Sequence, residues 1–140
     1  MKLSARNVLS GKVDKVTKGA VNAEVILTLA GGEEVVAIIT NTSADSLELK
    51  AGAAAFAVIK ASEVMIGKDL AGAKISARNV LDGTVSHVQD GAVNSEVTVT
   101  LRGGSQVVAS ITRESAHALS LKDGDSVSAI VKASNVMIGV

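Results

Sequence analysis

The sequence contains no cysteine, proline, tryptophan or tyrosine, and Phe56 is its only aromatic residue. Without cysteine, the chain has no disulfide framework, no thiolate metal site and no cysteine nucleophile. Its core must be built from Val, Ile, Leu and Ala, and such small side chains bury little area each. Two half-length domains would therefore be marginally stable alone, and we expect oligomerisation to stabilise them.

The sequence has no excess of charge of either sign, because 14 basic residues balance 14 acidic ones. Both signs are scattered through both halves of the sequence, so no basic face of the kind that nucleic-acid-binding proteins present is evident. The first ten residues lack the apolar run of a secretion signal, and no apolar stretch approaches the length of a membrane span. We expect a cytoplasmic protein without a membrane or nucleic-acid partner.

The sequence repeats itself after 72 residues. Residues 4–67 align with residues 76–139 without a gap, and about 38 of the 64 aligned positions are identical, including "SARNVL", "GAVN", "KAS" and "VMIG". This period is longer than that of the usual solenoid repeats and indicates duplication of a whole small domain. We predict a first domain over residues 1–68, a linker over 69–75 and a second domain over 76–140.

Within each repeat, the pattern predicts mostly strands. The stretch "NAEVILTLAGGEEVVAIIT" has two β-rich runs around a Gly-Gly turn, which is typical of a hairpin. "SADSLEL" has the apolar spacing of a short helix, "AAAFAVIKA" reads as another strand, and "SEVMIG" as a turn with a short closing strand. This order favours an all-β fold of two tandem OB-like five-stranded barrels, each with one short helix.

Comparison of the two repeats separates shared polar residues from variable ones. Both histidines are variable, since His87 aligns with Lys15 and His117 with Asp45, and neither has neighbours at metal-ligand spacing. Because no histidine is shared by the two repeats, no set of nucleophile, base and orienting group can be identified. We therefore expect neither an enzyme nor a metal-cation site. Glu24 and Glu96 are shared, but a lone carboxylate at the start of a strand usually forms a surface or interface ion pair.

The other shared polar residues are rich in hydrogen-bond donors. They comprise hydroxyl side chains and cations, with no carboxylate among them: Ser4, Arg6, Thr40, Ser43, Lys60 and Ser62 in the first repeat, and Ser76, Arg78, Thr112, Ser115, Lys132 and Ser134 in the second. Such a set suits a small dianion. It disfavours protonated phosphate, which needs an acceptor for its remaining proton.

Each of these residue types also has an ordinary structural role. Thr40 and Ser43 lie where the short helix should begin, so they suit a helix N-cap as well as an anion site. Lys60 ends an apolar strand and could simply extend its stem over the surface. Arg6 alone would usually be a surface cation. Only their combination and their duplication favour a binding site.

The same residues resemble a known family. "SARNVLSGKV", "KGAVNAEV", "ITNTS" and "VIKASEVMIG" are similar to the Mop, or molbindin, domain, and two copies resemble the tandem di-Mop proteins over nearly the whole chain. The resemblance implies OB-like barrels, a homotrimer, and molybdate, with tungstate as its analogue, bound at subunit interfaces. It places the anion contacts on the twelve shared residues, and on Ala61 and Ala133 beside the lysines. It leaves open whether the two arginines contact the anion through the side chain or the backbone.

The resemblance also implies a second type of oxyanion site on the threefold axis. The segments "KGAVNAE" and "DGAVNSE" are the candidates to line it, with Asn22 and Asn94 as donors. A loop that merely leads into a strand explains these segments equally well. The two repeats differ here, with Lys18 opposite Asp90, so two axial sites could bind unequally.

The family contains larger members, with a helix-turn-helix segment in repressors and an ATPase in transporters. No Gly-rich phosphate loop of the GxxxxGK[ST] form occurs in this sequence, and we expect no DNA-binding segment before the repeat. We therefore expect binding and storage of the oxyanion for molybdenum homeostasis. The alternatives are an OB-fold nucleic-acid-binding module, which should have aromatic stacking platforms and a basic groove, and a scaffold module without a small ligand.

Overall fold

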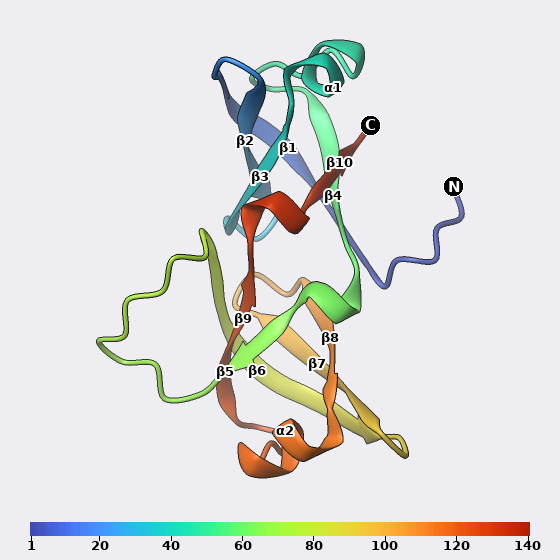
Figure 1. Cartoon of the computed structure of the whole chain (residues 1–140), viewed down its shortest axis with the longest axis vertical. Helices are drawn as coiled ribbons and strands as arrows, with labels where there is room; N and C mark the ends of the chain where they lie inside the picture. Colours follow the sequence, from blue (N-terminus) through green and yellow to red (C-terminus); the bar gives the residue numbers. More distant parts are fainter.

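The computed structural model describes all residues from Met1 to Val140. Two curled antiparallel five-stranded sheets lie one above the other along the long axis, with one short helix at each far end (Figure 1). The first repeat forms β1 (Asn7–Lys18), β2 (Asn22–Leu29), β3 (Glu34–Thr40), α1 (Asn41–Ser46), β4 (Ala54–Ile59), the 3-10 helix η1 (Ala61–Glu63) and β5 (Met65–Gly67). The second repeat forms β6 (Asn79–Asp90), β7 (Asn94–Leu101), β8 (Gln106–Thr112), α2 (Arg113–Ala118), β9 (Ser126–Val131), η2 (Ala133–Asn135) and β10 (Met137–Gly139). The predicted all-β class and order of elements are confirmed.

The two barrels exchange their fifth strands. The strand order is β10-β4-β1-β2-β3 in one sheet and β5-β9-β6-β7-β8 in the other. Met137 of the second repeat thus pairs with Val58 of the first, and Met65 of the first pairs with Ile130 of the second. In Figure 1 the red β10 lies in the upper barrel and the green β5 in the lower one. The predicted division of the chain near residues 68 and 76 separates the sequence repeats, whereas each barrel contains a strand from both.

The core follows from alternating apolar residues on these strands. On β2, Val25, Leu27 and Leu29 are buried while the residues between them are half-exposed, and β7 has the same pattern. The period of two places these side chains on one face of the curled sheet. Buried residues of both repeats form one continuous cluster of small aliphatic side chains. No helix in the chain is both long and apolar enough to cross a bilayer.

Two buried asparagines join the barrels. Asn79, the first residue of β6, donates from Nδ2 to the Val36 carbonyl at 2.8 Å and accepts from the Val36 amide at 2.7 Å. Asn7, the first residue of β1, makes the same pair of bonds to Val108 at 2.8 and 2.7 Å. Val36 and Val108 lie on the edge strands β3 and β8. Each side-chain amide thus substitutes for a neighbouring strand and satisfies edge groups that would otherwise be unpaired.

The turns of the two β-hairpins also touch. A Cβ atom on Gly31, in the β2–β3 turn, would lie 2.3 Å from the Cα atom of Gly103 in the β7–β8 turn. The Gly103 amide donates to Glu33 at 2.7 Å, across the same contact. Glycine is therefore required at both positions by the close approach of the two backbones.

The exchanged strands are covered by different side chains in the two barrels. The ring of Phe56 lies against Gly139 of β10. In the other barrel Ser128 aligns with Phe56, and Leu70 from the linker lies against Gly67 of β5 instead. Lys68 fixes the start of this linker, because it donates to the Leu119 carbonyl at 3.0 Å and pairs with Asp125 at 3.1 Å. The linker therefore supplies to the second barrel an apolar contact that the first repeat contains within β4.

The substitution Asn79→Ala should lower the free energy of unfolding by about 2–4 kcal/mol, because it leaves a buried amide and a buried carbonyl of Val36 without partners. Urea denaturation measures this loss. The half-buried Asn135, replaced by alanine in the same way, is the control and should lose at most about 1 kcal/mol. Equal losses in the two variants would contradict the bridging role of Asn79.

Candidate oxyanion site

Residues from both ends of the first repeat meet in one cavity of about 620 Å³. Five of the predicted site residues line it, namely Ser4, Arg6, Lys60, Ala61 and Ser62. Phe56 and Val58 of β4 and Met137 of the exchanged β10 provide an apolar wall. The cavity therefore combines cationic and hydroxyl groups with apolar side chains.

A neighbouring cavity of about 530 Å³ contains another part of the predicted set. Thr40 and Ser43 line it together with Ser134 from the second repeat, and Met137 and Ile138 of β10 line both cavities. The strand exchange explains this grouping, because η2 precedes β10 and packs against β3. Thr40 and Ser43 thus lie beside Ser134 of the second repeat. In the other barrel η1 of the first repeat packs against β8 in the same way.

The hydroxyls at the start of each short helix cap it. The Thr40 oxygen accepts from the Ser43 amide at 3.0 Å, and its own proton points to the Ser43 hydroxyl at 2.9 Å. Thr112 and Ser115 repeat this arrangement at 3.0 and 2.8 Å at the start of α2. The ordinary N-cap role is therefore present. It leaves the proton of each serine hydroxyl free for another acceptor.

Two exposed lysines precede the 3-10 helices. Lys60 and Lys132 occupy the N-cap positions of η1 and η2, and neither side chain makes a capping hydrogen bond. Neither lysine forms an ion pair with a carboxylate of the chain. Each is followed by a buried alanine, Ala61 or Ala133, and an exposed serine. Two uncompensated ammonium groups are thus available at equivalent places.

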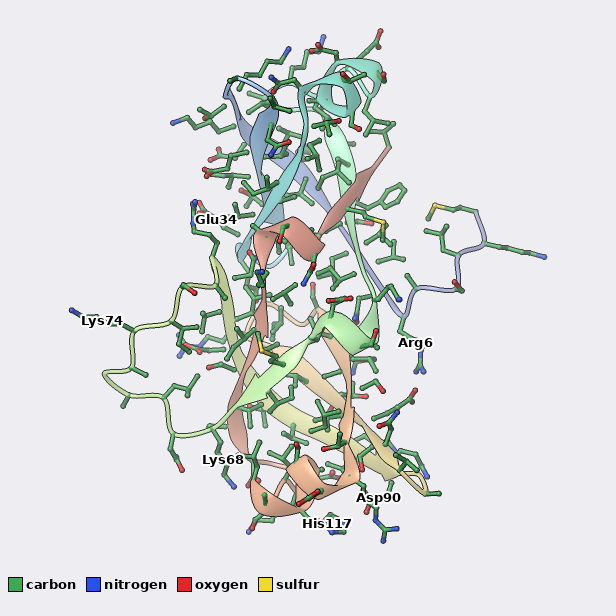
Figure 2. The ribbon with its side chains drawn as sticks, in the orientation of Figure 1. Arg6, Glu34, Lys68, Lys74, Asp90 and His117 are labelled. Carbon is green, nitrogen blue, oxygen red and sulfur yellow. The ribbon has the colours of Figure 1, made fainter.

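The two arginines, in contrast, are already paired. Arg6 donates to Glu96 on β7 at 2.6 Å, and Arg78 donates to both oxygens of Glu24 on β2 at 2.7 and 3.5 Å. Both pairs connect one repeat to the other, and Figure 2 shows Arg6 at the base of the projecting N-terminal segment. The hydrogen bond to Glu24 raises the pKa of Arg78 above its ordinary value. The expectation of a carboxylate-free cluster is therefore wrong for the arginines, because folding brings a shared glutamate to each.

The candidate axial residues lie next to the helix caps. Asn22 and Asn94 are exposed first residues of β2 and β7, and they pair in register with Thr40 and Thr112. The preceding turns are closed by bonds from the amides of Gly19 and Gly91 to the carbonyls of these asparagines at 2.7 and 2.8 Å. The loops and the helix caps thus form one polar end on each barrel.

The charges at these two ends are reversed. Lys18 pairs with Asp45 at the first end, whereas Asp90 contacts His117 at 3.2 Å at the second (Figure 2). Asp90 also accepts from the Ser95 hydroxyl at 2.5 Å. The bond from Ser95 and then the contact with His117 lower the pKa of Asp90. No group of three or more His, Cys, Asp or Glu side chains is placed to hold a metal cation.

Comparison with known proteins gives the family. The TOBE domain model matches residues 3–66 and again residues 75–138. The chain belongs to the TOBE-domain family. It is 45% identical to the molybdenum transport protein ModE of Herbaspirillum seropedicae and 43% identical to the molybdenum-pterin-binding protein MopA of Rhodobacter capsulatus. Each match covers 100% of this chain, but the chain spans only about half the length of these relatives, 52% and 53% respectively.

A solved structure is similar over the full length. The crystal structure of the cytoplasmic molybdate-binding protein ModG, with molybdate bound, is 49% identical and superimposes with a TM-score of 0.97. The match covers 100% of this chain and 99% of that one. The resemblance of this TOBE protein to the tandem Mop proteins is thereby confirmed, together with its two OB-like barrels.

Sequence reasoning missed the structural partners of the site. Asn7 and Asn79 are identical in the two repeats, but nothing in the sequence distinguishes them from ordinary polar residues at the start of a strand. Glu24 and Glu96 are shared as well, but the sequence does not identify Arg78 and Arg6 as their partners. Identity in both repeats was the available signal for all four residues. Asn7 and Asn79 are only 1% and 2% exposed, which explains why both repeats have an asparagine at this position.

The depressed pKa of Asp90 gives a pH prediction. A carboxylate whose pKa is lower in the folded than in the unfolded state stabilises the fold above its unfolded pKa of about 3.9, and this contribution is lost as the pH falls through the folded pKa. The variant Asp90→Asn should therefore be less stable than the parent at pH 7, and the difference should shrink below about pH 4. Thermal unfolding between pH 3 and 7, with exposed Asp123→Asn as control, measures it; a constant difference across this range would contradict the assignment.

Proposed function

We propose that the chain binds molybdate, and tungstate as its close analogue, without transforming it, and that it serves intracellular molybdenum storage and homeostasis in the cytoplasm. One observation carries the proposal. Residues far apart in the sequence, from Ser4 and Arg6 to Lys60 and Ser62, converge on one cavity and bring hydroxyl and cationic donors to its largely apolar wall. The names and the bound molybdate of the similar proteins support the choice of anion.

The donor set fits a tetrahedral dianion. Molybdate presents oxygens on every side and no proton, so hydroxyls and ammonium groups can replace its hydration shell. Ser4 and Ser62 would donate hydrogen bonds, while the unpaired Lys60 would supply countercharge. The apolar wall formed by Phe56 and Met137 would exclude water and strengthen these interactions.

The second repeat would form the equivalent site. Its members are the serines Ser76 and Ser134, Lys132 with Ala133, Arg78, and the capping hydroxyls of Thr112 and Ser115. The cavity that joins Thr40 and Ser43 to Ser134 supports sites that draw on both repeats. A weaker proposal concerns axial sites at Asn22 and Asn94, where the reversed charges of Lys18 and Asp90 would make the two ends bind unequally.

We further propose that the protein is a homotrimer. Exposed apolar side chains occur in pairs related by the repeat, and a second copy would cover them: Leu3 and Ile75, Val8 and Val80, Val21 and Val93, Met65 and Met137. A single exposed apolar side chain is common on the surface of a soluble protein. Their occurrence at equivalent places in both repeats favours an interface formed twice.

The alternative functions have less support. A nucleic-acid-binding OB module needs stacking aromatics and a basic groove, whereas the chain has Phe56 alone and a net charge of zero. Phe56 packs against Gly139 and has no second aromatic side chain beside it with which to form a stacking platform. A scaffold without a ligand would not need two uncompensated lysines beside clustered hydroxyls. We therefore propose no nucleic-acid partner and no enzymatic activity for this chain.

The substitution Lys132→Ala should weaken molybdate binding at second-repeat sites about tenfold or more, because a charge-assisted hydrogen bond to the anion is lost. Isothermal titration calorimetry measures affinity and stoichiometry. The control is Lys74→Ala, an exposed lysine of the linker (Figure 2), which should bind as the parent does. Unchanged affinity and stoichiometry in Lys132→Ala, with an unchanged melting temperature, would contradict the assignment of Lys132.

Native mass spectrometry should show a trimer that carries defined multiples of molybdate. The variant Val80→Glu should shift the population towards monomers, because the interface would bury an unpaired charge. Gln89→Glu places the same charge at an exposed position of β6 and should leave the trimer intact. A parent protein that binds molybdate as a monomer would contradict the trimer while leaving the binding proposal in place.

A further inference from the structure

Each candidate arginine is held by a glutamate of the other repeat. Arg6 lies on the wall of the oxyanion cavity, and its guanidinium donates to Glu96 at 2.6 Å. Arg78 makes the equivalent contact with Glu24. Glu96 is the third residue of β7 and Glu24 is the third residue of β2, so the two ion pairs are formed at equivalent places in the two repeats.

These ion pairs are open to water. In the Arg6–Glu96 pair the two side chains are 52% and 44% exposed. Pairs with this exposure are screened by solvent and contribute little to stability. A dianion that binds beside Arg6 could therefore displace the Glu96 carboxylate from the guanidinium at a small cost in free energy. Lys60, which lines the same cavity, has no such carboxylate to displace.

We propose that Glu96 and Glu24 are internal competitors of the bound oxyanion, each occupying the arginine that the anion would otherwise engage. This inference rests on the proposed function. Each carboxylate also places a negative charge beside a site for a dianion. Neutralising the glutamate therefore removes a repulsion and frees a cation at the same time.

The competition is unequal in the two repeats. Glu24 contacts both terminal nitrogens of Arg78, at 2.7 and 3.5 Å, whereas Glu96 makes a single contact with Arg6. Glu24 is also less exposed, 31% against 44% for Glu96. Arg78 is thus held more firmly than Arg6, and the site that contains Arg78 should bind the anion more weakly in the parent protein.

The test uses the full-length chain and the isosteric variants Glu96→Gln and Glu24→Gln, titrated with sodium molybdate by calorimetry. Each variant should bind about two- to fivefold more tightly than the parent at the affected sites, the factor expected for an exposed ion pair. The larger gain should occur in Glu24→Gln. Higher salt should reduce both gains, because screening weakens the interactions of exposed charges.

Glu34→Gln removes the same charge from an exposed position away from Arg6 (Figure 2) and should leave the affinity unchanged. If Glu96 only braces the contact between the repeats, Glu96→Gln would bind molybdate equally or more weakly and would have a lower melting temperature, and the inference would be wrong. Equal gains in Glu96→Gln and Glu34→Gln would also overturn it, since they would reflect net charge. Absence of molybdate binding in the parent and all variants would overturn the proposed function itself.

Discussion

The bidentate contact between an asparagine side chain and the backbone of an edge strand positions much of this molecule. Asn7 and Asn79 each begin the longest strand of their barrel and reach into the other barrel, where they pair with Val108 and Val36. The residue before each asparagine is the arginine, which is thereby directed to the neighbouring strand and its glutamate. Ser4 precedes Arg6 by two residues, so this part of the wall of the candidate cavity lies next in sequence to the buried Asn7.

The exchange of fifth strands adds the second constraint. Because β10 lies in the first barrel, Met137 and Ile138 separate the cavity of Lys60 from the cavity of Thr40. A barrel closed by its own β5 would place Ser62, rather than Ser134, before β3. The exchange therefore brings hydroxyl groups of the two repeats together in one cavity within a single chain.

Local patterns were sufficient to predict the elements but not their partners. The Gly-Gly turn and the alternating residues of β2 and β3 predicted the hairpin because both signals lie within one short segment. The fifth strand has the sequence Met-Ile-Gly in both repeats, so no local property distinguishes pairing with β4 from pairing with β9. The two fifth strands differ in contacts made by residues outside them, since Leu70 of the linker lies against Gly67 and Phe56 of β4 lies against Gly139.

The same distinction applies to the candidate site. Shared residue identity selected hydroxyl and cationic side chains as candidates, and five of the predicted residues meet in one cavity. It could not assign Glu96 to Arg6, because these residues are far apart in the sequence and meet only through the contact between the barrels. It also grouped Thr40 with Ser62 by repeat, whereas the structure groups Thr40 with Ser134.

The exchanged strands also change what holds the two halves together. In most tandem proteins the linker is the only permanent connection, and cutting it releases two independent bodies. Here β5 is hydrogen-bonded into the barrel beyond the linker, and β10 returns to the barrel before it. A chain nicked within residues 69–75 would therefore remain a single particle of two interlocked fragments, each completing the sheet of the other.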